Sequence, residues 1–293
     1  MRSQSAMEYL MTYGWAILVI AVILGVLFQL GVFGSANLAP KAKAGQCQVQ
    51  VVGGGSSSTH QLAGLCSSEL PQFVAQFNGG NSNIYLDSNA VLAGGSAITI
   101  SLWFNAQSIP SSGQNGWVDE ESLYGLKFSE PNNPTFCYTI NNGGAWTGCV
   151  STTYSFAPNT WYNLAFTWAS GGDMYFYING VASAPSGPVT GTLGTSSVVN
   201  YFEIGPSISG TPTSSSALDG DMANVQLYNA SLSQAEITAL YQEGIGGAPV
   251  RPQNIVGWWP LNGNTNDYSG NNNNGQGADV GYSSSWTNGY TQP

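Results

Sequence analysis

Apolar and polar residues follow two different patterns along this 293-residue chain. Near the amino terminus no charged residue occurs from Tyr9 to Pro40, and Glu8 stands directly before this stretch. An α-helix rises about 1.5 Å per residue, so the apolar part is long enough to cross a bilayer core of about 30 Å. The pattern predicts a hydrophobic helix over residues 4–36, preceded by a short leader over residues 1–3.

From Phe73 onwards the chain changes to short runs of β-branched and aromatic residues with turn residues between them. Near-alternation of apolar and polar positions, clearest in ITISLWFNA and MYFYING, is typical of strands. Many short strands in succession favour an antiparallel β-sandwich. Only SLSQAEITALYQEG has helical character, with Ser233 or Ser231 as the N-cap, Glu236 in the first turn and Gly244 at the end.

Charged residues are scarce, at 7% of the chain, and the formal net charge is -10. After the hydrophobic stretch the basic residues are Lys41, Lys43, Lys127 and Arg251. Nucleic-acid binding requires many basic side chains to neutralise phosphates, so this class of partner is excluded. The single histidine, His60, lies in the Gly/Ser/Thr stretch GGGSSSTHQL outside the predicted sandwich, which argues against a Ser–His–Asp triad.

The four cysteines all follow the hydrophobic stretch. An even number in an exported protein predicts two disulfides, and we favour Cys47–Cys66 and Cys137–Cys149 because each pair brackets a short stretch. Asn-Asn-Gly-Gly lies between the second pair and favours a hairpin turn. No C-x-x-C spacing is present, which argues against a zinc site.

The N-terminal run QSAMEYLMTYGWAILVIAVILGVLFQLGVF resembles the class III signal peptide of archaeal type IV pilins. In that family a prepilin peptidase cuts before the apolar run and leaves an acid at the fifth mature position. The resemblance implies cleavage between Ser3 and Gln4, and pairing of Glu8 with the freed ammonium of a neighbouring subunit. The chain departs from the family at Ser3, where glycine is common, and at Ala6, where serine is usual. A plain membrane anchor and a cleaved secretory signal are the alternatives, although the run is long for a secretory signal.

Six segments of the β-rich region resemble, in order, the laminin-G-like, concanavalin A-like jelly roll. They are FNGG, ITISLWFNA, TWYNLAFTW, MYFYINGV, FEIG and LDGDMANVQLYNASLSQAEI. The family's strand-to-helix run is matched at Gly220, Val225, Leu227, Tyr228, Asn229, Leu232 and Glu236, with Ala223 where an acid is common. The resemblance implies a jelly roll over residues 73–247, after a Cys-containing connector over residues 37–72.

Residues 254–290 resemble the segment that normally opens this same domain, although here they follow it. We therefore expect residues 248–293 to be a circularly permuted part that folds back and completes its own sheet, because sandwich termini usually lie close together. Donation of these strands to a neighbouring subunit is the alternative. Trp258, Trp259, Leu261 and Trp286 argue against a disordered tail, since such residues seek burial.

The tail also contains a candidate calcium site. Asp267, Ser269 and Asn271 place oxygen atoms at alternate positions around a glycine turn, and the jelly-roll family often holds calcium. An Asx-turn between strands explains the same residues equally well.

Exposed aromatic rings suggest a glycan-binding face, because sugars stack on such rings. The candidates in or beside predicted turns are Trp117 and Trp146, with Tyr124 and Tyr154 as further possibilities. Asn229-Ala230-Ser231 is the single N-x-S/T sequon and a candidate glycosylation site.

Catalysis is not predicted. A retaining glycosidase requires two carboxylates about 5–5.5 Å apart, and the chain lacks the E-x-D-x-x-E pattern that would present them on one strand. Asp119-Glu120-Glu121 has a suitable spacing but is interpreted as a solvated turn.

These observations predict a structural subunit of an archaeal type IV pilus-like surface filament, built from copies of this chain by prepilin peptidase and the pilus assembly machinery. Before assembly the N-terminal helix would sit in the cell membrane. The exposed jelly roll would serve adhesion or glycan binding at the cell surface. A membrane-anchored lectin that does not polymerise is the alternative, and a glycan hydrolase is the third hypothesis.

Overall fold

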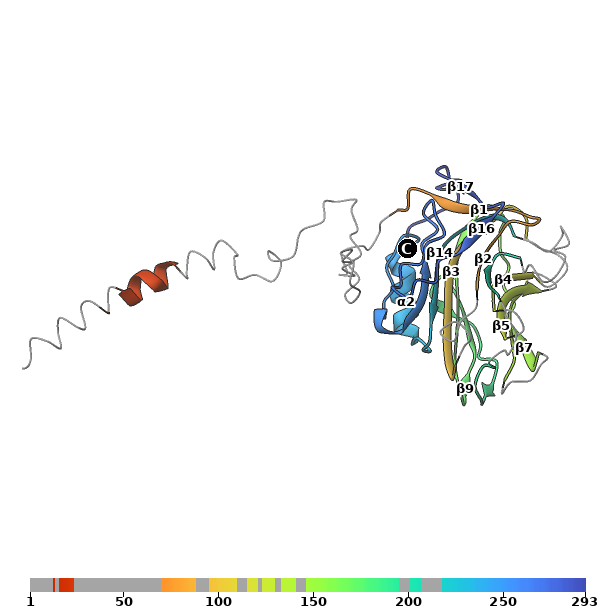
Figure 1. Ribbon diagram of the computed structural model, residues 1–293. Coiled ribbons are helices and arrows are strands. Elements are labelled where there is room, and N and C mark those ends of the chain that lie inside the picture. Colours follow the sequence, from red (N-terminus) through yellow and green to blue (C-terminus); the bar gives the residue numbers. More distant parts are fainter. Residues whose placement is uncertain are drawn as a thin grey trace, which may run out of the picture. The chain divides into compact units, whose positions relative to one another are not determined.

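The computed structural model describes residues 13, 16–23, 70–87, 95–109, 115–120, 123–129, 133–140, 146–194, 201–206 and 218–293, and the chain divides into two units, Met1–Cys47 and Gln48–Pro293. In the first unit residue 13 and residues 16–23 are helical and exposed (Figure 1). Within the described ranges no helix has both the length and the apolar character needed to cross a membrane. The remainder of the helix expected over residues 4–36 lies outside the described residues, together with Ser3, Gln4 and Glu8. The same holds for the connector up to residue 69, including Cys47 and Cys66.

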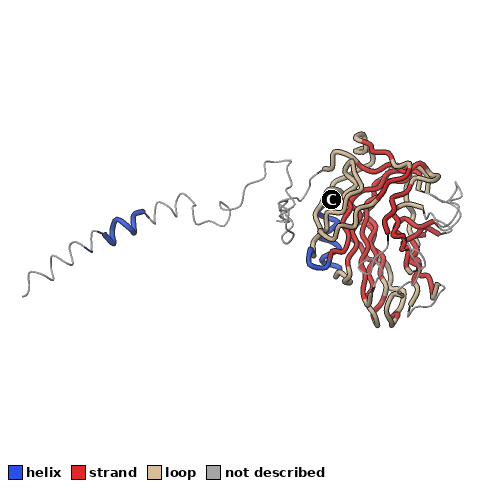
Figure 2. Tube along the Cα trace, viewed as in Figure 1, coloured by secondary structure: helices blue, strands red, loops and turns tan. Residues whose placement is uncertain are grey.

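The second unit is an antiparallel sandwich of two sheets, as predicted (Figures 1 and 2). In the described part of the chain, the first sheet has the order β11 (Val181–Ala182), β10 (Tyr175–Ile178), β8 (Trp161–Ala169), β3 (Ala97–Ala106), β14 (Asp219–Tyr228), β1 (Val74–Asn78) and β17 (Gly281–Ser283), and β15 (Ile255–Trp259) also pairs with β14. The second sheet has the order β16 (Gln276–Ala278), β2 (Asn83–Asp87), β13 (Tyr201–Ile204), β4 (Asn115–Glu120), β5 (Tyr124–Ser129), β6 (Asn133–Tyr138) and β7 (Gly148–Ser151). Two short strands, β9 (Gly172–Asp173) and β12 (Pro188–Val189), pair with each other.

The alternation of side chains along strand β3 explains where the core lies. Alternate side chains of a strand point to opposite faces, and Ile100, Leu102 and Phe104 enter the core between the sheets. Thr99 and Ser101 point to the other face and are nevertheless buried. That outer face is covered by the helix α2 (Gln234–Glu243) and by the C-terminal tail (Figure 1), so the first sheet is buried on both sides.

Helix α2 begins and ends where the sequence predicts. Ser233 is the N-cap and forms a capping box with Glu236, and Gly244 follows the last turn with a φ of 81° that favours glycine. Ile237 and Leu240 are its buried residues and pack in the cluster that contains Trp258. The helix is therefore fastened to the outer face of the first sheet by an apolar stripe.

The charge on Glu236 gives a pH-dependent contribution to stability. Burial raises the pKa of Glu236, but hydrogen bonds from Ser233 and Arg251 outweigh it and hold the pKa below its ordinary value of 4.5. The contribution is therefore present above pH 4.5 and is lost as pH falls through the lowered folded-state pKa. When the free energy of unfolding is measured at decreasing pH, we expect the wild type to lose about 1 kcal/mol or less through this group. Glu236→Gln should not show that loss. Equal acid sensitivity of the two proteins would contradict this assignment.

The C-terminal tail contributes strands to both sheets of its own domain. Strand β15 pairs with Val225–Tyr228 of β14, beyond the part of β14 that pairs with β1. Strands β16 and β17 extend β2 and β1 at the sheet edges. Trp286 donates its indole N–H to the carbonyl of Pro71 at 3.1 Å, so the tail also holds the start of the domain. In this structure the tail folds back onto its own chain.

Candidate functional site

The outer face of the second sheet carries a row of directly paired residues. Their neighbours along each strand, such as Ile204, Val118 and Phe136, point into the core, so the row itself points outward. From β2 to β7 the row consists of Tyr85, Glu203, Asp119, Gly125, Cys137 and Cys149. The row therefore brings two acidic residues, Glu203 and Asp119, onto the same face of the sheet as a glycine and the disulfide.

Lys127 lies two residues beyond Gly125 on β5 and shares this outer face. Its Nζ is 3.6 Å from Oδ1 of Asp119 and 4.3 Å from the centroid of the Trp146 ring. The ammonium group thus joins a carboxylate on β4 to an aromatic ring that precedes β7. Cation–π contacts of this kind contribute about 0.5–1 kcal/mol at exposed sites and more where water is excluded.

Gly125 is required for this contact. A Cβ at that position would lie 1.9 Å from Oδ1 of Asp119 and 2.7 Å from Cε of Lys127. Any other residue would therefore push apart the two charged side chains. The glycine allows both to fold over the strand.

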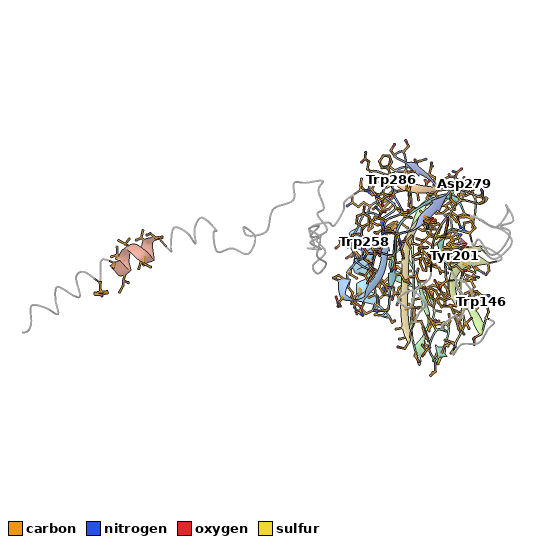
Figure 3. All side chains as sticks on the ribbon, in the orientation of Figure 1. Trp146, Tyr201, Trp258, Asp279 and Trp286 are labelled. Carbon is orange, nitrogen blue, oxygen red and sulfur yellow. A yellow bond between two sulfur atoms is a disulfide. The ribbon has the colours of Figure 1, made fainter. Side chains whose placement is uncertain are left out.

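The disulfide Cys137–Cys149 confirms the predicted pairing and ties β6 to β7. Trp146 lies just before β7, and the next residue, Thr147, donates its N–H to the carbonyl of Tyr138 at 2.8 Å. The hydroxyl of Thr147 accepts the N–H of Ile140 at 2.8 Å. The backbone that directly follows Trp146 is therefore held by two hydrogen bonds. Trp146 remains 40% exposed, and Figure 3 shows it at the margin of the domain.

Two of the predicted surface aromatics are core residues, which corrects the sequence interpretation. Trp117 is fully buried and stacks on Phe128, with ring centroids 4.0 Å apart. A register shift between Gly116 and Val118 places Trp117 in a β-bulge, which turns its side chain inward. Tyr124 is also fully buried, and burial, followed by the charges of Glu120 and Asp119, raises its pKa.

The acidic run that was interpreted as a turn is also different in the structure. Asp119 and Glu120 are the last residues of β4 and are buried, whereas Glu121 lies outside the described residues. Asp119 tolerates burial because it pairs with Lys127, eight positions along the chain, a contact that strand periodicity alone does not predict. Glu203 faces Asp119 directly across β13 and β4 and was not recognised as a candidate from the sequence. Both carboxylates are buried, so neither is presented openly to a substrate.

Tyr154 is exposed, as expected for a residue in a connecting segment. Its ring contacts Phe156 at 4.6 Å and Tyr162 at 5.9 Å between centroids. Burial and then the neighbouring Tyr162 and Tyr241 raise its pKa. Tyr154 therefore packs at the edge of the aromatic core, and a binding role for it stays a prediction.

The candidate calcium ligands of the tail are joined by internal hydrogen bonds. Oδ1 of Asp267 accepts the N–H groups of Trp258 and Ser269, at 2.9 and 2.8 Å. Oδ2 accepts the hydroxyl of Ser269 and the N–H of Asn273, at 2.8 and 2.9 Å. The amide of Asn271 donates to the carbonyls of Ile255 and Val256. A carboxylate has about four lone-pair positions, and these donors use all of them, so the loop as folded does not fit a calcium ion. Calcium binding stays a prediction that this geometry does not favour.

We expect Asp267→Ala to lower the free energy of unfolding by about 2–4 kcal/mol, because its four donors lose their acceptor. Chemical denaturation measures this change. A chelator is expected to leave the melting temperature of the wild type unchanged. If calcium instead raises that temperature, and Asp267→Asn removes the effect, the loop is a calcium site after all.

Comparisons with known proteins agree on the fold. The model of a family described as the concanavalin A-like lectin/glucanases superfamily matches residues 78–238. A candidate carbohydrate-binding protein from Bacteroides ovatus is similar in structure, with 16% identity and a TM-score of 0.57; the match covers 73% of this chain and 60% of that protein, less than two thirds of its length. A heptameric SAP-like pentraxin from Limulus polyphemus matches with 12% identity and a TM-score of 0.49, over 72% of this chain and 94% of that one. No curated protein sequence matches the chain. At such identities the structural likeness shows the fold alone.

Proposed function

Because the chain belongs to the concanavalin A-like lectin/glucanases superfamily, we propose that its jelly roll is a carbohydrate-binding domain. The ligand would contact the Trp146 face, which we define as Trp146 and Lys127 on the outer side of the second sheet, where Lys127 pairs with the buried Asp119. The observation that carries the proposal is the exposed Trp146 ring. Every other tryptophan that the structure describes is less than 5% exposed.

The physical argument starts from the position of the Trp146 ring. Tryptophan has a large apolar surface that normally seeks burial, and an indole held in place loses little conformational entropy when a ligand binds. Lys127 contacts one face of the ring and itself pairs with Asp119. A pyranose ring offers an apolar C–H face for stacking and hydroxyl groups for hydrogen bonds. A rigid exposed indole on a β-sheet surface is suited to that ligand.

The charge distribution indicates neutral rather than acidic glycans. In residues 73–293 the basic residues are Lys127 and Arg251. Lys127 pairs with Asp119, and Arg251 pairs with Glu236. Neither side chain is therefore available to bind a carboxylate or sulfate group of a sugar. The chain also carries a net charge of -10, which repels anionic polymers.

A panel of immobilised neutral and acidic glycans tests this proposal with the full chain, at low and high salt. We expect retention on neutral glycans with little change on adding salt, because no charge pair contributes to binding. Retention on acidic glycans alone, weakened by salt, would contradict the ligand class. No retention on any glycan would contradict carbohydrate binding itself.

We propose further that residues 4–36 place this domain on a type IV pilus-like filament at the cell surface, assembled from copies of the chain after prepilin cleavage. The support is the sequence, with Glu8 at the head of a long uncharged run. A buried carboxylate requires a partner, and the freed ammonium at Gln4 of a neighbouring subunit would supply one. A membrane-anchored lectin that does not polymerise is the competing proposal.

The N-terminal mass of the protein from its native membrane tests the first step, with a start at Gln4 expected. Glu8→Ala is then expected to abolish filaments seen by electron microscopy, whereas Glu8→Asp retains the charge and serves as the matched control. Filaments of normal number from Glu8→Ala, or an intact Met1, would favour the plain anchor.

A further inference from the structure

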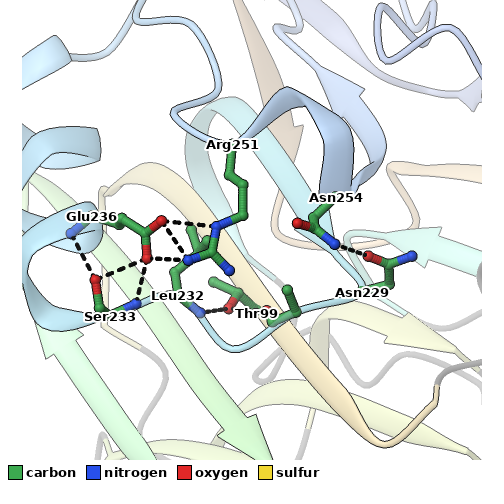
Figure 4. Close-up of polar contacts among 8 residues, drawn as sticks. Thr99, Asn229, Leu232, Ser233, Glu236, Arg251 and Asn254 are labelled. Carbon is green, nitrogen blue, oxygen red and sulfur yellow. Dashed lines mark hydrogen bonds and ion pairs between the residues drawn. The ribbon is translucent and has the colours of Figure 1, made fainter.

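The single sequon of the chain, Asn229-Ala230-Ser231, lies in the turn that joins β14 to α2 (Figure 4). Asn229 is exposed, and Ser231 is partly exposed. An N-x-S/T tripeptide on the surface of an exported protein is an acceptor for N-linked glycans. The observed Cys137–Cys149 disulfide is typical of exported proteins, which supports access to such a modification.

Hydrogen bonds between described residues hold the turn through the backbone and the amide oxygen of Asn229. The N–H of Asn229 donates to the carbonyl of Asn254 at 3.0 Å, and Nδ2 of Asn254 donates to Oδ1 of Asn229 at 2.9 Å. These two bonds fix the backbone and the amide oxygen of Asn229. Its Nδ2 donates to none of the described residues, and Figure 4 shows it directed away from Asn254.

The residues that follow Asn229 are held by a threonine of strand β3. The buried hydroxyl of Thr99 donates to the carbonyl of Ala230 at 2.6 Å and accepts the N–H of Leu232 at 2.9 Å. The hydroxyl of Ser231, in contrast, makes no hydrogen bond to the described part of the chain, and the residue is partly exposed. A turn asparagine that served only the fold would explain the bonds to Asn254. It would not require a serine two residues later whose hydroxyl makes no hydrogen bond to the described residues.

We propose that Asn229 carries an N-linked oligosaccharide. In the transfer step Nδ2 of Asn229 attacks the anomeric carbon of a lipid-phosphate-linked oligosaccharide, and a new C–N bond forms. The bond from that carbon to the phosphate oxygen breaks, the lipid phosphate leaves with the electron pair, and Nδ2 loses one proton to a base of the transferase. The bond between Asn254 and Oδ1 is compatible with the product, because it does not involve Nδ2.

The attached glycan would not block the Trp146 face. Asn229 follows β14 in the first sheet, whereas Trp146 precedes β7 at the edge of the second sheet. Figure 3 shows Trp146 and Trp258 on different sides of the domain, and Trp258 packs with α2 in the layer next to Asn229. Modification and ligand binding therefore use different surfaces.

Intact-mass and peptide mass spectrometry of the full chain from its native cells tests the proposal. We expect the peptide containing Asn229 to be heavier than its sequence by a whole number of sugar residues. Asn229→Gln and Ser231→Ala are expected to remove the added mass, and Ser231→Thr is expected to keep it. Ser231→Ala is the more discriminating variant, because that hydroxyl makes no hydrogen bond within the described ranges. The melting temperature of this variant should equal that of an enzymatically deglycosylated wild type.

An unmodified Asn229 peptide in the native protein would overturn the proposal. So would an added mass that maps to this peptide but survives both Asn229→Gln and Ser231→Ala. Neither result depends on whether the Trp146 face binds sugars.

Discussion

Deletion of residues 255–293 is expected to abolish folding of the domain, although the family match ends at residue 238. The deletion removes β15, β16 and β17, and with them Trp258, Trp259 and Trp286, each less than 5% exposed. Loss of one buried large aromatic side chain costs about 3–5 kcal/mol. Three such losses are comparable with the whole stability of a domain, about 5–15 kcal/mol.

Buried polar groups add to this cost. The indole N–H of Trp258 donates to Oδ1 of Asn224 at 2.8 Å, and the N–H of Asn224 donates to the carbonyl of Pro260 at 3.1 Å. Asn224 lies in β14 between the part paired with β1 and the part paired with β15. At this point the pairing of β14 with β3 also shifts its register. Without the tail, the second half of β14 would keep β3 but lose β15, one of its two partner strands, and Asn224 would lose two hydrogen bonds.

A circular permutant distinguishes the effect of losing the tail residues from the effect of changing the order of the segments along the chain. The chain is opened between Pro252 and Gln253, which are both exposed, and a flexible linker joins Pro293 to Leu70. We expect this permutant to unfold cooperatively at a melting temperature within a few degrees of the domain in its natural order. The truncated domain should show no cooperative transition by circular dichroism. A truncated domain that unfolds cooperatively, or a permutant that does not fold, would contradict the structural role given to the tail.

Trp146→Ala is expected to weaken glycan binding at least tenfold while leaving the melting temperature nearly unchanged. The ring is 40% exposed, so its removal creates no core cavity. A tenfold change corresponds to about 1.4 kcal/mol, within the range of a central aromatic contact in an interface. Titration calorimetry with the neutral glycan retained on the panel measures the change.

Val181→Ala is the matched control, because Val181 is 70% exposed and lies on β11 at an edge of the other sheet. It should bind as the wild type does. If both variants bind equally well, the Trp146 face is not the binding surface. If Trp146→Ala lowers the melting temperature by many degrees, the ring is a structural element and the site must be sought elsewhere.

The sequence predicted the β-sandwich, the helix α2 and the second disulfide because each depends on short-range physical rules. Alternation placed Ile100, Leu102 and Phe104 on one face of β3. Ser233 and Glu236 are three residues apart and form a capping box within one helical turn. Cys137 and Cys149 bracket a hairpin, so the turn itself brings them together. Local periodicity and turn chemistry are sufficient for such features.

The candidate site was predicted only in part, because exposure of a side chain is a property of the whole fold. Trp117 and Trp146 both follow glycine-rich turns in the sequence, yet a bulge turns Trp117 into the core and leaves Trp146 at the surface. Asp119 looked like a loop residue because an isolated charge is costly to bury. Its partner, Lys127, reaches it only when β4 and β5 are adjacent.

The strands, the capped helix, the scarcity of charge and the sequon can all be read from the amino-acid sequence, because they follow from residue types at fixed spacing. Three features depend on the tertiary structure: which aromatic ring faces solvent, which acidic residue pairs with Lys127, and which strands pair with the tail. Residues 255–259 pair with β14, which begins at residue 219. Strand β16 pairs with β2, although almost the whole domain separates the two strands along the chain. Such contacts depend on packing between segments far apart along the chain, and the pattern of any one segment does not contain that information.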